Sequence, residues 1–201
     1  MMTNQSTMEV ITNRRSIRKF TSDAISKEQI EAILEAGRQA PSGKNRQPWH
    51  FVVIDSLKAR ENLYEVMQKG NDAYAELFGE AGLGSARNTL RAMRESRFTV
   101  LIVSPDIPHP IYSADGEENP MRISDIVDLQ SVGAAIQNMI LAAWEMGIGS
   151  LWICDTFHSY PALVEEYKLE GLLVAAVSFG IAAEAPAARP RKPMQEIVTR
   201  L

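Results

Sequence analysis

The sequence predicts a single domain in which helices flank a central β-sheet. Two observations predict this fold class. Short, continuous apolar runs have the length of buried strands, and they lie at residues 50–54, 98–103, 151–154 and 172–179. Stretches with the apolar spacing of helices separate these runs, and helices outnumber strands. No internal repeat and no linker divides the 201-residue chain, so residues 1–201 are expected to form one domain.

The N-terminal part contains two helix-start patterns. Ser6 is followed three residues later by Glu9, and Ser26 is followed three residues later by Gln29. In such a capping box, each residue satisfies a free backbone N–H group of the other. The first pattern predicts a short helix. The second predicts an amphipathic helix over residues 27–39, where apolar residues recur at helical spacing.

Prolines and glycines divide the middle of the chain. Residues 40–49 contain two prolines and a glycine, which predict a loop with fixed corners. Helical patterns cover residues 57–69 and 72–97, and the second of these has a glycine-containing centre. Residues 105–122 contain four prolines and one glycine, so a long loop is predicted there. Residues 147–150 predict a tight turn before the third strand.

The longest predicted helix covers residues 123–146. Its second half, residues 132–144, has only Gln137 and Asn138 as strongly polar residues. A helix that is apolar nearly all round is buried on all sides. This helix is therefore expected to pack both on the sheet and against a second subunit. A short further helix is predicted to begin at Pro161.

The C-terminal segment differs in composition from the rest of the chain. Residues 182–193 are rich in alanine and proline, and they carry Arg189, Arg191 and Lys192. Such a segment cannot build a core of its own. It is expected to lie extended and to reach across a partner.

Charge and cysteine content exclude several classes of protein. The net charge is −4, which argues against broad nucleic-acid binding because that needs a basic face. Cys154 is the only cysteine and the three histidines lack metal-ligand spacing, so neither a disulfide within the chain nor a metal site is expected. The N-terminus lacks an apolar signal core, and no apolar run reaches the roughly 18 residues that span a bilayer. We therefore expect a cytoplasmic protein without a membrane or nucleic-acid partner.

A basic run, Arg14 to Phe20, follows the first predicted helix. Arginine binds phosphate oxygens with two parallel hydrogen bonds, and the hydroxyl of Ser16 adds a further donor. The run therefore predicts a phosphate-binding site. Its alternative interpretation is a solvated basic patch on the surface. A third interpretation, a nucleic-acid or anion-binding domain that uses this run alone, is disfavoured by the acidic net charge.

A second basic feature is a row of arginines at helical spacing, Arg87, Arg91, Arg94 and Arg97. One interpretation is a solvated helix face. The other is that the row borders the mouth of an active site and attracts NAD(P)H or an acidic substrate.

Three separated segments together resemble the flavin-dependent nitroreductase family. They are residues 14–18, residues 40–49 and residues 147–153, and a weaker match follows at residues 189–193. The resemblance implies an α+β fold with a mostly antiparallel sheet flanked by helices. It also implies a homodimer that binds FMN at the subunit interface, with residues 182–201 as an extended C-terminal arm.

The resemblance also implies which residues contact the cofactor. Those matching the phosphate and ribityl contacts are Arg14, Arg15 and Ser16, joined at the phosphate by Arg189 and Arg191. Arg18 matches a basic residue beside the flavin pyrimidine. The loop near the ring, contributed by the other subunit, matches Pro41, Ser42 and Asn45. The strand end beneath the ring matches Trp152, Ile153, Cys154 and Asp155.

Several roles remain open for individual residues of this set. Trp152 has a second interpretation as a core residue. Cys154 is expected to be a small buried residue beside the ring, and its alternative is a nucleophile. No side-chain acid or base is assigned, because the flavin carries the chemistry.

The resemblance implies an oxidoreductase in which NADH or NADPH reduces FMN by hydride transfer. Reduced FMN then reduces an acceptor such as a nitroaromatic or a quinone, with ping-pong kinetics. Two alternatives stand beside this reading. One is a flavin-dependent reductase of an enone or aldehyde, and the other is a flavin-binding sensor or storage module without turnover.

Overall fold

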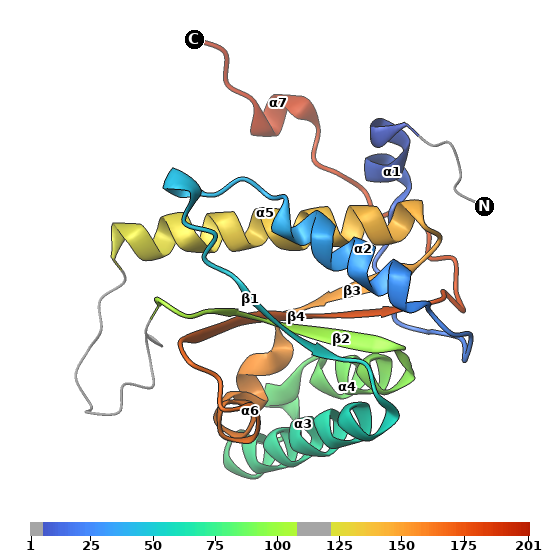
Figure 1. Cartoon of the computed structure of the whole chain (residues 1–201), viewed down its shortest axis with the longest axis vertical. Helices are drawn as coiled ribbons and strands as arrows, with labels where there is room; N and C mark the ends of the chain where they lie inside the picture. Colours follow the sequence, from blue (N-terminus) through green and yellow to red (C-terminus); the bar gives the residue numbers. More distant parts are fainter. Residues whose placement is uncertain (1–5, 108–121) are drawn as a thin grey trace.

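The protein is built on a four-stranded antiparallel sheet (Figure 1). The computed structural model describes residues 6–107 and 122–201. The strands are β1 (His50–Ile54), β2 (Phe98–Ser104), β3 (Gly149–Ile153) and β4 (Leu172–Gly180). Their spatial order is β1-β2-β4-β3, and all three neighbouring pairs run antiparallel. The predicted α+β class with a mostly antiparallel sheet is confirmed.

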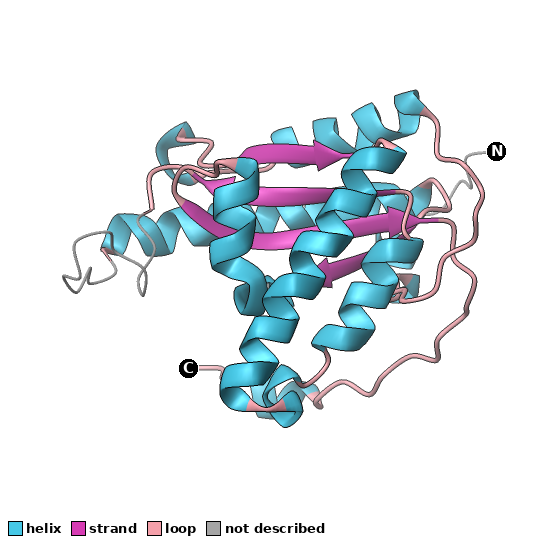
Figure 2. Cartoon of the chain, turned by 90° about the horizontal axis from the view of Figure 1, so that it is seen from below, coloured by secondary structure: helices cyan, strands magenta, loops and turns pink. Residues whose placement is uncertain are grey.

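Helices cover both faces of the sheet (Figures 1 and 2). One face carries α1 (Thr7–Asn13), α2 (Lys27–Arg38) and α5 (Ile123–Glu145). The other carries α3 (Leu57–Phe78), α4 (Ala86–Glu95) and α6 (Tyr160–Tyr167). The wholly buried strand β2 divides the core, because successive side chains of a strand point to opposite faces. Val100 and Ile102 pack in the cluster under α2 and α5, whereas Leu101 and Val103 pack in the cluster under α3 and α6.

Both predicted capping boxes are present. At the start of α2, the N–H of Gln29 donates to Ser26 Oγ at 3.2 Å, and the N–H of Ser26 donates to Gln29 Oε1 at 3.0 Å. The same reciprocal pair joins Ser6 and Glu9 at the start of α1. Two local sequence patterns thus set the beginnings of two helices.

The α2 cap leads to a stability prediction. Ser26→Ala leaves a helix N–H without its partner and is expected to lower the free energy of unfolding by about 1 kcal/mol. Urea unfolding followed by circular dichroism measures this. The control is Ser22→Ala, since the exposed Ser22 hydroxyl forms no hydrogen bond with the described residues. An identical midpoint for both variants would show that the cap contributes nothing.

The predicted boundary between helices at residues 69–72 is wrong. Helix α3 continues to Phe78, and a short 3-10 helix (Glu80–Leu83) precedes α4. Gly70 lies inside α3, where a Cβ atom would come within 2.4 Å of Ser159 Oγ. This glycine permits close packing against the segment before α6. The break occurs instead at Gly79, whose φ of 79° belongs to the left-handed region.

The longest helix, α5, is buried on one side only within this chain. Its buried residues in the second half are Val132, Ala135, Ile136, Met139, Ile140 and Ala143. The residues between them, such as Gly133 and Leu141, are half-buried. Complete burial is therefore not a property of the single chain, and the second subunit stays a prediction. Among the described helices, α5 alone has the length and apolar composition of a membrane span, and 44% of that window is buried inside the protein.

Backbone pairing brings the two ends of the chain together. After α1, the N–H of Ile17 donates to the Ser150 carbonyl oxygen of β3 at 2.9 Å. The N–H of Ala183 then donates to the carbonyl oxygen of Lys19, also at 2.9 Å. Past this point the chain lacks regular structure as far as α7 (Met194–Ile197), and residues 187–201 are all exposed. The basic run therefore lies beside the C-terminal segment.

Beyond these elements, the third strand starts earlier than predicted. Strand β3 begins at Gly149, within the expected turn, because Gly149 pairs with Gly180 of β4. A Cβ atom on Gly149 would meet the Ile17 side chain at 2.8 Å, so the glycine allows the basic run to approach. The predicted loop at residues 105–122 falls mostly outside the described residues.

Candidate functional site

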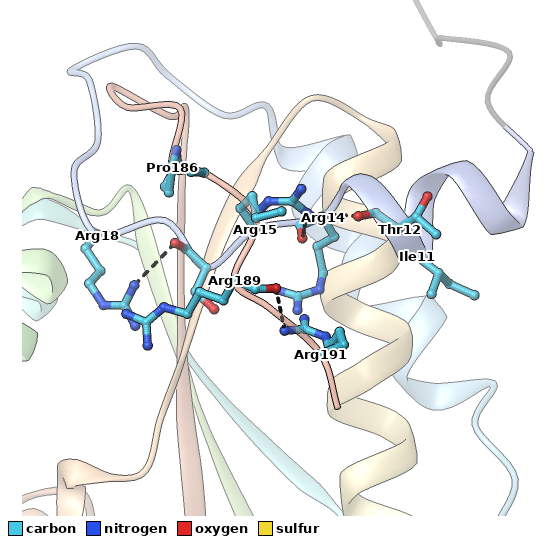
Figure 3. A pocket seen from close by; sticks show the side chains of 11 residues that line it. Ile11, Thr12, Arg14, Arg15, Arg18, Pro186, Arg189 and Arg191 are labelled. Carbon is cyan, nitrogen blue, oxygen red and sulfur yellow. Dashed lines mark hydrogen bonds between the residues drawn. The ribbon is translucent and has the colours of Figure 1, made fainter. Parts of the chain in front are cut away.

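A pocket of about 550 Å³ opens where the basic run meets the C-terminal segment (Figure 3). The predicted cofactor residues that line it are Arg14, Arg15, Ser16, Arg18, Arg189 and Arg191. They come from two segments more than 160 residues apart in sequence. The Arg18 N–H donates to a Glu184 carboxylate oxygen, which adds to the backbone pairing that joins the two segments.

The guanidinium groups in this pocket lack counter-ions among the residues that the structure describes. Arg15 Nη1 donates to the Thr12 carbonyl oxygen at 2.8 Å, and Arg191 Nη1 donates to that of Arg189 at 3.4 Å. Burial lowers the pKa of Arg14, and the nearby charges of Arg191 and Arg15 lower it further. A bound anion would relieve both effects. The pocket is therefore suited to a group with more than one negative charge.

The loop that contains Pro41, Ser42 and Asn45 lies away from this pocket. Its backbone is left-handed at Lys44, Asn45 and Gln47, with φ of 53°, 55° and 50°. For a residue other than glycine this conformation costs roughly 1–2 kcal/mol, and asparagine tolerates it best. The N–H of Gln47 donates to Ser42 Oγ at 3.0 Å, which bridges the ends of the strained stretch.

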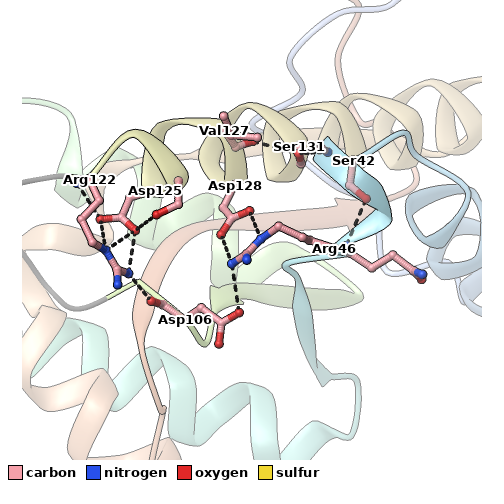
Figure 4. A network of polar contacts seen from close by, with 11 residues as sticks. Ser42, Arg46, Asp106, Arg122, Asp125, Val127, Asp128 and Ser131 are labelled. Carbon is pink, nitrogen blue, oxygen red and sulfur yellow. Dashed lines mark hydrogen bonds and ion pairs between the residues drawn. The ribbon is translucent and has the colours of Figure 1, made fainter.

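An ion pair joins the same loop to α5 (Figure 4). Arg46 Nε donates to Asp128 Oδ1 at 3.0 Å, and Arg46 Nη2 donates to Asp128 Oδ2 at 2.8 Å. The Asp128 side chain is 1% exposed, whereas that of Arg46 is 42% exposed. Arg46 also contacts the exposed Asp106 at 3.3 Å. The sequence predictions missed Arg46 and Asp128, because Asp128 is one of two aspartates in the first half of α5 and nothing in the sequence shows that it is buried.

The end of β3 presents the remaining predicted residues. Trp152 is 38% exposed, so its interpretation as a core residue is wrong, and Ile153 is buried. The Asp155 carboxylate accepts hydrogen bonds from Ser85 and Thr89, both at 2.8 Å. These contacts fix the segment that follows the strand against the start of α4.

Cys154 is exposed in this chain, which corrects the expectation of a buried residue. Partial desolvation and, secondarily, the charge of Asp155 raise the pKa of its thiol. A raised pKa leaves less thiolate at neutral pH, which weakens the nucleophile interpretation.

The raised pKa of the Cys154 thiol predicts how its alkylation rate depends on pH. Alkylation of Cys154 by iodoacetamide should be slower at pH 7 than that of a free cysteine peptide, and it should still be accelerating at pH 9. Because Cys154 is the only cysteine, mass spectrometry of the intact protein follows it directly. Faster alkylation than the peptide at pH 7 would contradict the raised pKa.

The arginine row does not act as one surface, and its last member, Arg97, lies beyond the end of α4 at Glu95. Arg87 forms ion pairs with Asp72 and Glu80, and Arg94 lies 4.3 Å above the Tyr64 ring. Because its charges are engaged by separate partners, the arrangement favours the interpretation of an ordinary solvated helix face.

A family model described as the Nitroreductase family matches residues 11–181. The chain belongs to the nitroreductase family. The match covers both core clusters and the basic run, and it stops where the C-terminal segment begins. The predicted family is thereby confirmed.

Relatives and solved structures resemble this nitroreductase-family chain over nearly its whole length. The NADPH-flavin oxidoreductase of Vibrio harveyi is 31% identical, and the match covers 96% of this chain and 72% of that protein. YfhC of Bacillus subtilis, named as an NAD(P)H nitroreductase, is 26% identical over 96% of this chain and 93% of its own. A structure from Desulfovibrio desulfuricans, described as a nitroreductase in complex with FMN, is 27% identical with a TM-score of 0.72. That match covers 99% of this chain and 98% of the other.

The nitroreductase-family chain thus places its predicted site residues in three groups. The arginines and Ser16 share one pocket. The loop residues 41–45 lie near α5. Residues 152–155 lie at the end of β3 and just after it. The pocket lacks residues of the other two groups. This separation agrees with the expectation that the loop serves the other subunit, which stays a prediction.

Proposed function

We propose that the chain is an FMN-dependent oxidoreductase that takes electrons from NADH or NADPH. The observation that carries the proposal is the pocket of arginines without counter-ions among the described residues. A phosphomonoester carries about two negative charges near neutral pH, which would balance the charge of these arginines. Family membership and the named relatives support the same cofactor and donor.

Different residues of the chain contact different parts of FMN. Arg14, Arg15 and Ser16 bind the phosphate from one side, and Arg189 and Arg191 bind it from the other. Arg18 is the residue at the ring end, where a fixed cation favours the negatively charged reduced cofactor. Pro41, Ser42 and Asn45 would approach from a second subunit, and Trp152, Ile153, Cys154 and Asp155 would lie beneath the ring.

A homodimer completes the proposed site. The half-buried side of α5 offers an apolar surface, and a Cβ atom on Gly133 would meet nothing within 4 Å. Residues 187–201 are all exposed and would reach across a second copy. We place the dimer in the cytoplasm, consistent with the single cysteine, which allows no disulfide within the chain.

When bound, FMN supplies the acceptance and donation of hydride. The protein supplies position and electrostatics. A backbone N–H at Ile153 to Asp155 would hold the reactive edge of the ring without side-chain chemistry. Donor and acceptor would use the same open face in turn, which predicts ping-pong kinetics. The acceptor class is a nitroaromatic or quinone, with an enone or aldehyde as the second candidate.

The proposal is tested by an absorbance spectrum followed by anaerobic titration with NADH and NADPH. We expect a yellow protein whose flavin absorbance near 450 nm is bleached by one of the two donors, as flavin oxidoreductases are. A protein that binds no flavin would contradict the proposal. A flavin that neither donor bleaches would favour a sensor or storage module instead.

A further inference from the structure

We propose that the ion pair between Arg46 and Asp128 is a positioning element for the cofactor. It holds loop 41–47 in the strained conformation that presents Ser42 and Asn45 to FMN. The inference rests on the proposed function, because it concerns the same site. It assigns a role to Arg46 and Asp128, neither of which is among the predicted site residues.

Packing does not hold the strained part of the loop. Residues 44–47 are all exposed, and three of them have left-handed backbone. The hydrogen bonds within the loop, such as Asn45 N–H to the Ser42 carbonyl oxygen and Gln47 N–H to Ser42 Oγ, both at 3.0 Å, restrain its shape but do not attach it to the rest of the protein. A strained segment persists only where its surroundings over-determine it. The position of the strained loop on the protein therefore has to be set by contacts with the body of the protein.

Those contacts converge on one turn of α5. A Cβ atom on Gly43 would lie 2.4 Å from Val127 Cγ1, so the loop backbone sits directly on the helix. The Gly43 N–H donates to Ser131 Oγ at 3.3 Å. Next to these two contacts, Asp128 receives both hydrogen bonds from Arg46. Figure 4 shows the loop and the helix joined at this point.

Asp128 makes the attachment difficult to release. Its side chain is 1% exposed, and both oxygens accept from Arg46 alone among the described residues. A buried carboxylate that loses its partner is strongly disfavoured. Arg46 must therefore stay at this helix, and the direction of the residues on either side of it is set by that requirement. Asn45 and Gln47, both left-handed, are those neighbours.

The test separates positioning from stability. A single change at Arg46 would leave Asp128 buried and unpaired, which can unfold the protein. The double variant Arg46→Met/Asp128→Leu removes both charges and replaces them with apolar groups, a change that preserves folding in comparable ion pairs. We expect it to raise the dissociation constant for FMN by about 10-fold or more, because loop misplacement loses contacts. We also expect an altered visible spectrum of the flavin at saturating FMN.

The matched control is Arg38→Met. Arg38 donates two hydrogen bonds of 2.7 Å to Glu35 with the same forked geometry, but the pair lies exposed on α2. This control should leave the FMN affinity and spectrum unchanged. Arg46→Lys keeps the charge but cannot form the two parallel hydrogen bonds. Its FMN affinity should fall between those of wild type and the double variant. It gives the same comparison if the double variant does not fold.

The outcomes distinguish this inference from the proposed function. Wild-type protein that binds no FMN would overturn both. Wild-type protein that binds FMN, with a double variant of unchanged affinity and spectrum, would overturn the positioning role alone. A lowered unfolding midpoint with unchanged FMN affinity would also overturn it, because that is the signature of a purely structural pair.

Discussion

Arg14→Ala is expected to raise the dissociation constant for FMN by about 10- to 100-fold, because a hydrogen bond to a charged partner contributes roughly 1.5–3 kcal/mol. Arg14 is the arginine whose pKa is lowered by burial and by its neighbours Arg191 and Arg15. A partly desolvated cation among like charges gains most from a bound dianion. Flavin fluorescence titration of the apoprotein measures the change. Affinity for riboflavin, which lacks the phosphate, should be nearly the same in wild type and variant.

A matched surface arginine controls for the loss of charge. Arg91 is exposed on α4, and its described side-chain hydrogen bond goes to Asn88 at 3.2 Å. Arg91→Ala lowers the net charge equally and should leave both affinities unchanged. If Arg14→Ala weakened the binding of riboflavin as much as the binding of FMN, Arg14 would not be a phosphate contact.

Arg18→Ala is expected to act on reduction of the flavin more than on its retention. Removing the cation from the ring end disfavours the negatively charged reduced form. We expect the midpoint potential to fall by about 30 mV, which corresponds to about tenfold for a two-electron couple. The rate of anaerobic reduction by NADH or NADPH should fall by a similar factor. Stopped-flow spectroscopy and a redox titration measure these two quantities.

Lys19 provides the control for Arg18. It is the next residue along the same segment, it is exposed, and its carbonyl oxygen rather than its side chain pairs with Ala183. Lys19→Ala should change neither the potential nor the affinity. Equal effects of Arg14→Ala and Arg18→Ala on affinity and reduction would contradict the division between a phosphate end and a ring end.

Local patterns made much of the fold predictable. The capping boxes at Ser6 and Ser26 depend on residues three positions apart, and both are formed as expected. Apolar runs also located the four strands of the described residues, because β2 and β4 are almost wholly buried and need no polar alternation. Gly70 shows where this reasoning fails. A glycine that breaks a helix and one that lets a distant Ser159 pack closely look alike in sequence.

The candidate site was predictable where motifs are contiguous. The family resemblance assigned the basic run and Arg189 to Arg191 to one phosphate, and the structure brings them to one pocket through the bridge between Phe20 and Ala182. The Arg46–Asp128 pair was missed because its members are 82 residues apart. The burial that makes Asp128 significant depends on the packing of α5. The exposure of Cys154 was also misjudged, because it depends on how the chain packs just after β3.

The central claim is that the arginine pocket binds the phosphate of FMN, and comparing FMN with riboflavin tests it most directly. Both flavins should be titrated into the apoprotein under one buffer and salt condition. We predict that FMN binds at least about 100-fold more tightly than riboflavin, since several charge-assisted hydrogen bonds form with the phosphate alone. We also predict that this ratio shrinks as salt concentration rises. Equal affinities for the two flavins would contradict the assignment of the pocket.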